Sequence, residues 1–265
     1  MLGLSLDAYK LKWIAIIGMV LSHMLYAWWD VLPFWLILIL SGLGGLTFPI
    51  MSFFVVEGYK HTSNLKKYMF RLFVFGLIAA PFHFLVIAWP LLNIMFSIVW
   101  GLFILVLYDK IRIRALFWVL YIVVIIPVSF LVFEYYFIGT NLILMFYIIK
   151  NENARRIVPP LFAGVTWLVI AALGLWQISL MSADAVVQET IFRNQHLLYN
   201  RNFMISIFPF ALVSMFVAFL LKSFNGERGK RMKWFFYVVY PLHFAVLAAI
   251  GLIIGTIDVM GILGM

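Results

Sequence analysis

The chain has 265 residues, of which 66% are hydrophobic and only 11% are charged. Soluble globular chains carry about a quarter charged residues, so this composition excludes a water-soluble domain, and lipid is the solvent that fits it. The formal net charge is +9, and the absence of cysteine excludes disulfides, thiolate nucleophiles and cysteine-ligated zinc or iron–sulfur sites.

Apolar stretches separated by short polar or proline-containing breaks predict an all-α bundle of about nine membrane-spanning helices, because each span needs about 20 residues. The helices are expected over residues 12–29, 36–58, 68–88, 92–109, 114–133, 136–150, 158–180, 203–221 and 234–256. Residues 31–58 are too many for one straight span, so one helix kinked at Pro49 and two separate pieces both remain open. The sixth helix is short and is expected to be tilted, buried or broken. Residues 1–265 are predicted to form a single transmembrane domain.

The distribution of lysine and arginine predicts the orientation of this bundle. If the amino terminus lies in the cytoplasm, all of the 19 lysines and arginines except Arg193 and Arg201 fall in inner segments. Positive residues are retained on the cytoplasmic side, so the amino terminus is predicted inside and the carboxyl terminus outside. The charge of +9 is therefore interpreted as membrane-surface charge beside the lipid bilayer, with no nucleic acid as a partner.

Three histidines fall within predicted spans, namely His23, His83 and His243. Ionisable groups inside a membrane are costly and often mark function, and histidine is the usual general base near neutral pH. Each could instead be a neutral imidazole hydrogen-bonded between helices, and the spacing does not show that the three meet. Asn93 could donate a hydrogen bond to a developing oxyanion, or it could be an ordinary helix cap.

The densest polar segment runs from Glu57 to Arg71 and is predicted to face the cytoplasm. Its lysines and arginine could clamp the phosphates of an anionic cofactor, or they could be a positive-inside loop beside anionic lipid. No Walker A, HExxH or GxSxG motif is present. The glycines Gly42, Gly44 and Gly45 predict close helix packing.

Several short stretches that run nearly from end to end of the chain resemble one known family. They are Leu11-Lys12-Trp13-Ile14-Ala15 with Ser22-His23, Phe48-Pro49-Ile50 with Val56-Glu57-Gly58, His61-Thr62-Ser63-Asn64 with Tyr68 and Arg71-Leu72, Pro81-Phe82, Asn93 to Gly101, Glu134-Tyr135-Tyr136 with Phe146-Tyr147, and Phe236-Tyr237 with Tyr240-Pro241-Leu242-His243. Their order and spacing are similar to those of the TraX family of membrane acetyltransferases, named for the protein that acetylates the amino terminus of F-type conjugative pilin.

This resemblance implies transfer of an acetyl group from cytoplasmic acetyl-CoA, with no metal, to an amine or hydroxyl acceptor at the membrane or outer face. It implies a multi-pass protein of the bacterial cytoplasmic membrane and a peptide, pilin or glycan acceptor. His23 is the expected general base, or less favourably the site of an acetyl-histidine intermediate, and Asn93, Ser97 or His243 would bind the oxyanion or orient His23. The pantetheine arm of the donor is expected to thread a polar channel. The candidate acetyl-CoA-binding residues are Lys60, His61, Thr62, Lys66, Lys67, Arg71, Lys110, Arg112 and Arg114.

Two residues depart from the family pattern. Ser22 stands where the family often has aspartate before the first-helix histidine, and His83 replaces the acidic residue after Pro-Phe. A neighbouring carboxylate favours a charged imidazole, so the effect of Ser22 on the protonation of His23 is left open. The outer loop 181–202 is the natural place for acceptor choice.

Two other functions remain open at this stage. One is a transporter or flippase that uses the three histidines as a proton relay, and its sign would be an inverted repeat with two broken helices. The other is a non-catalytic assembly factor that tolerates replacement of the three histidines. A flat exposed helix face could support a homodimer.

Overall fold

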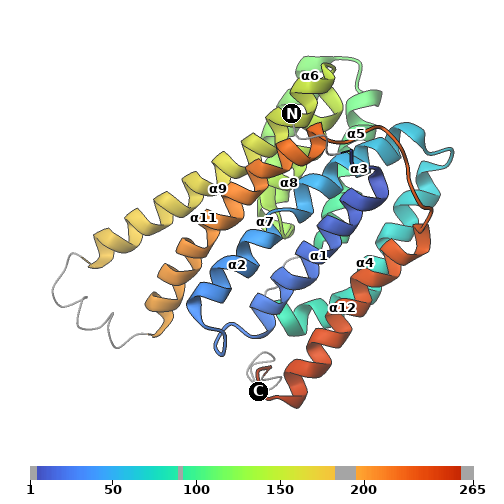
Figure 1. The fold of residues 1–265 in the computed structure, drawn as a ribbon. Helices are drawn as coiled ribbons and strands as arrows, with labels where there is room; N and C mark the ends of the chain where they lie inside the picture. Colours follow the sequence, from blue (N-terminus) through green and yellow to red (C-terminus); the bar gives the residue numbers. More distant parts are fainter. Residues whose placement is uncertain (1–4, 89–91, 183–194, 258–265) are drawn as a thin grey trace.

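The computed structural model describes residues 5–88, 92–182 and 195–257, and within these ranges the regular structure is helical, without β-strands. The elements, shown in Figure 1, are α1 (Ala8–Ala27), α2 (Phe34–Gly44), α3 (Thr47–His61), α4 (Leu65–Ile87), α5 (Ile94–Lys110), α6 (Arg114–Leu120), the π-helical turn η1 (Tyr121–Ile125), α7 (Ile126–Val132), α8 (Tyr136–Ile148), α9 (Glu152–Ser182), α11 (Gln195–Lys222) and α12 (Lys233–Ile253). The prediction of an all-α bundle is confirmed.

Seven helical segments in the described part are long and apolar enough to cross a membrane. They are Ala8–Ala27, Phe34–His61, Leu65–Ile87, Arg114–Val132, Glu152–Leu180, Asn200–Lys222 and Trp234–Ile253. Two further predicted spans appear as shorter helices, α5 with 17 residues and α8 with 13. The chain is therefore a multi-pass membrane protein, and its sixth span is short, as expected.

The second span is two helices, α2 and α3, and it breaks at Gly45 and Leu46. The interruption falls one turn before Pro49, at the carbonyl position where a proline removes a helical hydrogen bond. Pro49 lies in the first turn of α3, which begins at Thr47, and the backbone N–H groups of a first helical turn have no intrahelical partner to lose. Proline therefore costs little there, and the break falls at the preceding glycine.

Glycines bring α1, α2 and α11 into close contact. A Cβ atom on Gly18 would lie 2.4 Å from the carbonyl oxygen of Leu43, and one on Gly45 would lie 2.2 Å from that of Phe210. Real Cβ contacts are never this short, so only glycine lets these backbones approach. Across the same contact, Ser41 Oγ donates to the Ser206 carbonyl at 2.6 Å.

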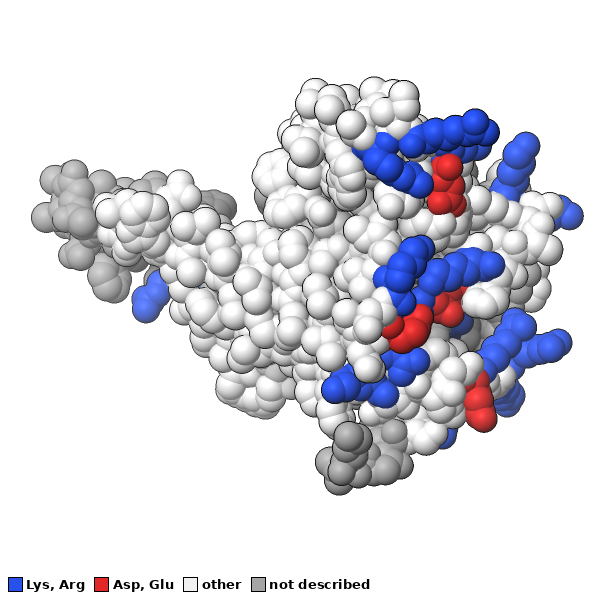
Figure 2. All heavy atoms as spheres, turned by 90° about the horizontal axis from the view of Figure 1, so that it is seen from above, with Lys and Arg blue, Asp and Glu red and all other residues white. Residues whose placement is uncertain are grey.

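The cationic side chains gather at one end of the bundle. Figure 2 views the molecule from above in the orientation of Figure 1, and most of the visible lysine and arginine side chains gather over one part of this face, with a few acidic side chains among them. The start of α1 lies at this end, and α12 runs to the opposite end (Figure 1). Because positive residues are retained on the inner side of a membrane, we assign this end as the cytoplasmic face and the opposite one as the outer end.

Candidate active site

The structure brings His23 of α1 against His243 of α12, although 220 residues separate them. Nδ1 of His23 lies 2.8 Å from Nε2 of His243, and the two rings are stacked with centroids 5.0 Å apart. Both side chains are buried. His23 is 15 residues into α1, which places it about 22 Å from the cytoplasmic end and well inside a hydrocarbon core about 30 Å thick.

The second nitrogen of His243 fixes the proton positions in this pair. Nδ1 of His243 lies 3.0 Å from the carbonyl oxygen of Val239, which can only accept a hydrogen bond. In the neutral pair Nδ1 of His243 therefore carries its proton, Nε2 of His243 accepts, and Nδ1 of His23 donates to it. Nε2 of His23 is left with a lone pair, which is the form that a general base needs.

His83 of α4 lies beside this pair. Its Nε2 is 3.5 Å from a carboxylate oxygen of Glu134, and neither atom makes a hydrogen bond within the described part of the protein. The ring of Phe244 contacts all three histidines, with centroid distances of 4.5 Å to His23, 5.1 Å to His83 and 4.2 Å to His243. The three histidines that the sequence placed in separate spans therefore surround one phenylalanine.

Glu134 is positioned by a short backbone bridge between the α7–α8 connection and the segment before α5. Its N–H donates to the carbonyl of Leu92 at 3.0 Å, and the N–H of Leu92 donates to the carbonyl of Val132 at 2.9 Å. The 13 residues of α8 separate Glu134 from the cytoplasmic face. At 1.5 Å per residue this is about 20 Å, close to the depth of His23.

A cavity of about 100 Å³ adjoins His23 and Glu134. Besides these two residues it is lined by Ser22, Leu25, Tyr26, Ser41, Tyr135, Trp167, Phe203, Ser206, Ile207 and Phe210. Its walls come from α1, α2, α9, α11 and the α7–α8 connection. A reacting group could therefore reach His23 from this side.

A smaller void of about 20 Å³ lies between the histidine pair and the cytoplasmic face. It is lined by Ala15, Ile16, Met19, Thr47, Met51, Ile94, Met95, Ile98, Phe236, Val239 and Tyr240. Such a volume holds about one water molecule, and most of the lining is apolar. On this route the described residues enclose a narrow and largely apolar void.

Asn93 is the N-cap of α5. Its Oδ1 accepts from the N–H of Met95 at 3.1 Å, and its Nδ2 donates to the carbonyl of Gly76 at 3.0 Å. The hydroxyl of Ser97, one turn further along α5, is buried without a hydrogen-bond partner among the described residues. Of these two candidate oxyanion donors, Ser97 is the one whose donor is uncommitted.

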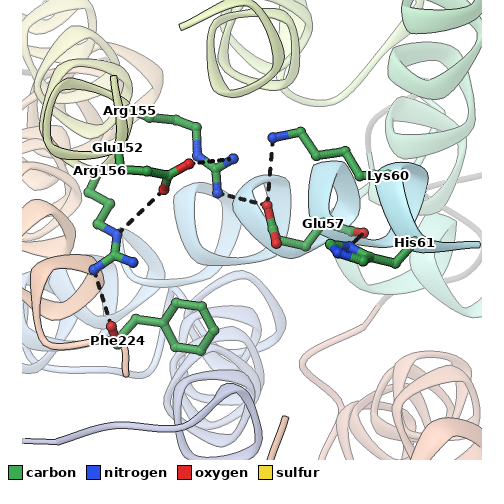
Figure 3. Close-up of polar contacts among 7 residues, drawn as sticks. All are labelled: Glu57, Lys60, His61, Glu152, Arg155, Arg156 and Phe224. Carbon is green, nitrogen blue, oxygen red and sulfur yellow. Dashed lines mark hydrogen bonds and ion pairs between the residues drawn. The ribbon is translucent and has the colours of Figure 1, made fainter. Parts of the chain in front are cut away.

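At the cytoplasmic face an ion-pair cluster joins α3 to α9 (Figure 3). Arg155 is buried and donates to Glu57 at 2.7 Å, and it lies 3.4 Å from Glu152. Lys60 is 3.9 Å from Glu57, and Nδ1 of His61 is 2.8 Å from the Glu57 carbonyl. Sequence reasoning did not single out Arg155, because nothing in the sequence showed that Glu57 would meet it across 98 residues.

The other candidate donor-binding residues lie around this cluster without a carboxylate partner among the described ion pairs. Lys66, Lys67, Lys110 and Arg112 are exposed, and Thr62 caps α3. Arg114 donates to the Tyr108 carbonyl and covers its ring. Arg71 lies 5.8 Å from the ring of Tyr237, and its Nε is buried without a hydrogen-bond partner among the residues that the structure describes. Lys12, which the sequence did not single out for this role, lies against the rings of Phe54 and Phe236.

The family is shown by comparison with known sequences. Residues 7–251 match the family described as TraX protein. The chain belongs to the TraX family. This confirms the resemblance seen in the short motifs, and it covers both histidines of the pair.

A probable fimbrial assembly protein FimC, serogroup H1, from Dichelobacter nodosus is similar to part of the chain. The two are 42% identical over 91 residues, which is 32% of this chain and 35% of the relative. The alignment thus spans about a third of that relative's length. No solved structure matches this member of the TraX family.

Proposed function

We propose that this protein is a membrane-embedded acyltransferase that moves an acetyl group from cytoplasmic acetyl-CoA to an acceptor reached from the outer half of the bundle. The observation that carries the proposal is the contact of 2.8 Å between His23 and His243. That contact, together with the bond to Val239, leaves Nε2 of His23 as a base beside a cavity of about 100 Å³. Membership of the TraX family supports the same reaction class.

In the proposed reaction His23 acts as general base on a neutral amine or hydroxyl. The acceptor nitrogen or oxygen attacks the thioester carbonyl carbon, and its proton passes to Nε2 of His23. The C–S bond then breaks, and the sulfur takes that proton from His23 to give free CoA and the acetylated acceptor. His243 holds the tautomer of His23 through the hydrogen bond at Nδ1. Ser97 is a candidate donor to the oxyanion.

The donor would bind with its nucleotide at the cytoplasmic face. Cations without a carboxylate partner suit phosphate oxygens, and Lys66, Lys67, Arg71, Lys110 and Arg112 meet this condition among the described ion pairs. Lys60 and His61 are engaged by Glu57 and contribute less. The void of about 20 Å³ must widen before a pantetheine arm can reach His23, so donor binding is expected to separate α1 from α12.

The acceptor is proposed to be the amino terminus of a pilin-type peptide in the bacterial cytoplasmic membrane. The name of the Dichelobacter nodosus relative associates that protein with fimbrial assembly, and the cavity lies in the outer half of the bundle, away from the donor face. A glycan hydroxyl is the alternative. The predicted acceptor-selecting loop at residues 181–202 falls largely outside the described residues, although α9 and α11 lead directly to it.

Calorimetry tests the donor half of this proposal. Acetyl-CoA, CoA and dephospho-CoA are titrated into the purified protein in detergent, with Lys66→Ala/Lys67→Ala as the variant. We expect micromolar binding that weakens when the 3′-phosphate is missing or when the two lysines are removed. Absence of binding by an intact, monodisperse sample would contradict the proposal and favour the transporter.

A further inference from the structure

Glu134 is a carboxylate placed about 20 Å into the bundle from the cytoplasmic face, where lipid surrounds the protein. A charge at this depth is costly unless it is paired or serves a function. Its Oε2 is buried and makes no hydrogen bond within the described residues, and the side chain keeps 21% exposure. Within the described part of the protein its ion-pair partner is His83 at 3.5 Å, and that partner is charged only when it is protonated.

The cavity that Glu134 lines has the chemistry of a site for an organic cation. Five of its lining residues are aromatic, and no lysine or arginine lines it within the described part of the chain; the aromatic residues are Tyr26, Tyr135, Trp167, Phe203 and Phe210. Aromatic faces attract ammonium groups, and the attraction grows when water is excluded. A carboxylate combined with aromatic walls therefore fits an alkylammonium group.

Other cations fit this cavity less well. Calcium and magnesium need six or more oxygen ligands, and magnesium keeps several of its waters, whereas Glu134 is the only carboxylate among the described lining residues. A guanidinium would pair with both carboxylate oxygens, but one of them already faces His83. An alkylammonium needs a single carboxylate oxygen and an apolar wall for its chain.

We propose that Glu134 and the aromatic wall of this cavity bind the ammonium form of the acceptor beside His23, so that Glu134 selects a primary amine against a hydroxyl. This inference rests on the proposed function and adds the residue that recognises the acceptor. His83, whose Nε2 lies 3.5 Å from Oε2 of Glu134, is the positioning residue for this carboxylate. The small residues Ser22, Ser41 and Ser206 leave room for the first carbon atoms of the acceptor chain.

An ammonium group must lose a proton before it can attack. In this scheme the ammonium gives its first proton to the Glu134 carboxylate, which later releases it to water. The neutral amine then attacks the thioester carbonyl, its second proton passes to Nε2 of His23, and the leaving sulfur takes that proton. The balance is one ammonium and one acetyl-CoA giving one acetamide, one CoA and one proton.

Saturation-transfer NMR on the protein in lipid nanodiscs tests this site without any donor. Propylammonium and propan-1-ol are compared as probes of nearly equal size, so the comparison in the unmodified protein needs no variant. We expect a binding signal for propylammonium and at least about tenfold weaker binding of the alcohol, because a charge-assisted hydrogen bond is lost. Equal signals from the two probes would overturn the proposal.

Variants locate the site. Glu134→Gln is expected to weaken propylammonium binding about tenfold or more, whereas Glu134→Asp keeps the charge and retains much of it. Glu152→Gln is the matched control, because Glu152 is 60% exposed at the cytoplasmic face. If Glu134→Gln does not fold, Trp167→Leu removes one ring of the wall and is expected to weaken the ammonium signal more than the alcohol signal.

The result separates this inference from the proposed function. Glu134-dependent ammonium binding in a protein that does not bind acetyl-CoA would leave the site standing and contradict acyl transfer. Acetyl transfer with ammonium binding unchanged in Glu134→Gln would leave the enzyme standing and overturn the role of Glu134.

Discussion

At the scale of single residues, the ability of His23 to act as a base depends on which ring nitrogens of His23 and His243 carry a proton. The sequence identifies His23 and His243 as ionisable groups in separate spans, but no spacing rule can show that residues 220 positions apart meet. The structure adds their contact and the Val239 carbonyl, and the tautomer of both rings follows from these. The sequence likewise marks Asn93, but only the structure shows both of its polar atoms engaged in capping α5 and bonding to α4.

Replacing His243 tests its role as the positioning residue for His23. His243→Leu removes the acceptor at 2.8 Å from Nδ1 of His23 and frees the tautomer, so we expect the acetyl transfer rate to fall about tenfold or more. His243→Gln offers an amide oxygen as acceptor and should recover part of the loss. The measurement is the pH profile of the rate. Equal rates and profiles in the two variants would contradict a role through the hydrogen bond.

Arg155 is the residue whose loss should cost most stability at the cytoplasmic face. Removing it leaves Glu57 with only the longer contact to Lys60 at 3.9 Å, and losing a charged hydrogen bond from this partly exposed carboxylate costs about 1–3 kcal/mol. We expect Arg155→Ala to lower the thermal unfolding midpoint in detergent clearly. Arg156→Ala is the control, because Arg156 is more exposed and donates to the Phe224 carbonyl. Equal midpoints in the two variants would show that the ion pair between Arg155 and Glu57 does not stabilise the contact between α3 and α9.

At the scale of elements, the second span shows what local rules can and cannot supply. Hydropathy and length locate residues 34–61 in the membrane. Because this segment is too long for one straight span, the sequence predicts that the helix is kinked or divided. The break falls at Gly45 and Leu46, one turn before Pro49, and it coincides with a close tertiary contact. Gly45 passes so close to the Phe210 carbonyl that a side chain would not fit, and this neighbour lies 165 residues away in the chain, beyond the reach of local rules.

Alanine substitutions at Gly42, within α2, and at Gly45, just after it, test the close contact with α11. A Cβ on Gly45 would lie 2.2 Å from the Phe210 oxygen, whereas one on Gly42 would lie 3.4 Å from the nearest side-chain atom. We expect Gly45→Ala to destabilise the protein by about 1–3 kcal/mol, as overpacking does, and Gly42→Ala to be nearly neutral. Thermal unfolding in detergent compares the two. A neutral Gly45→Ala would mean that the contact with α11 does not require a glycine at this position.

At the scale of the whole molecule, the number and order of spans could be predicted because each apolar run must satisfy the same membrane thickness. The nine predicted segments correspond to those found, and the cationic side chains gather at one end (Figure 2). The grouping of the helices could not be predicted. Which faces meet depends on the glycines of α1 and α2 and on the contact between α12 and α4.

The cysteine-free sequence allows the orientation to be measured directly. Single cysteines replace Ser63 and Ile113 at the predicted cytoplasmic face and Asp30 at the outer end, and all three positions are exposed. We expect a membrane-impermeant maleimide to label Asp30→Cys in intact cells, and Ser63→Cys and Ile113→Cys only after the membrane is opened. The reverse labelling would show that the bundle has the opposite orientation, with its basic face away from cytoplasmic acetyl-CoA.

Acetyl transfer by a His23 variant tests the central claim most directly. Membranes from cells that lack the gene are supplied with the unmodified protein or with His23→Ala, both matched for amount and insertion, and are incubated with acetyl-CoA labelled in the acetyl group. We predict that labelled acetyl appears in membrane protein only with the unmodified chain, and that His23→Ala loses at least about 100-fold in rate, as expected for a lost general base. Equal labelling by the two proteins would contradict the assignment of His23 as the catalytic base.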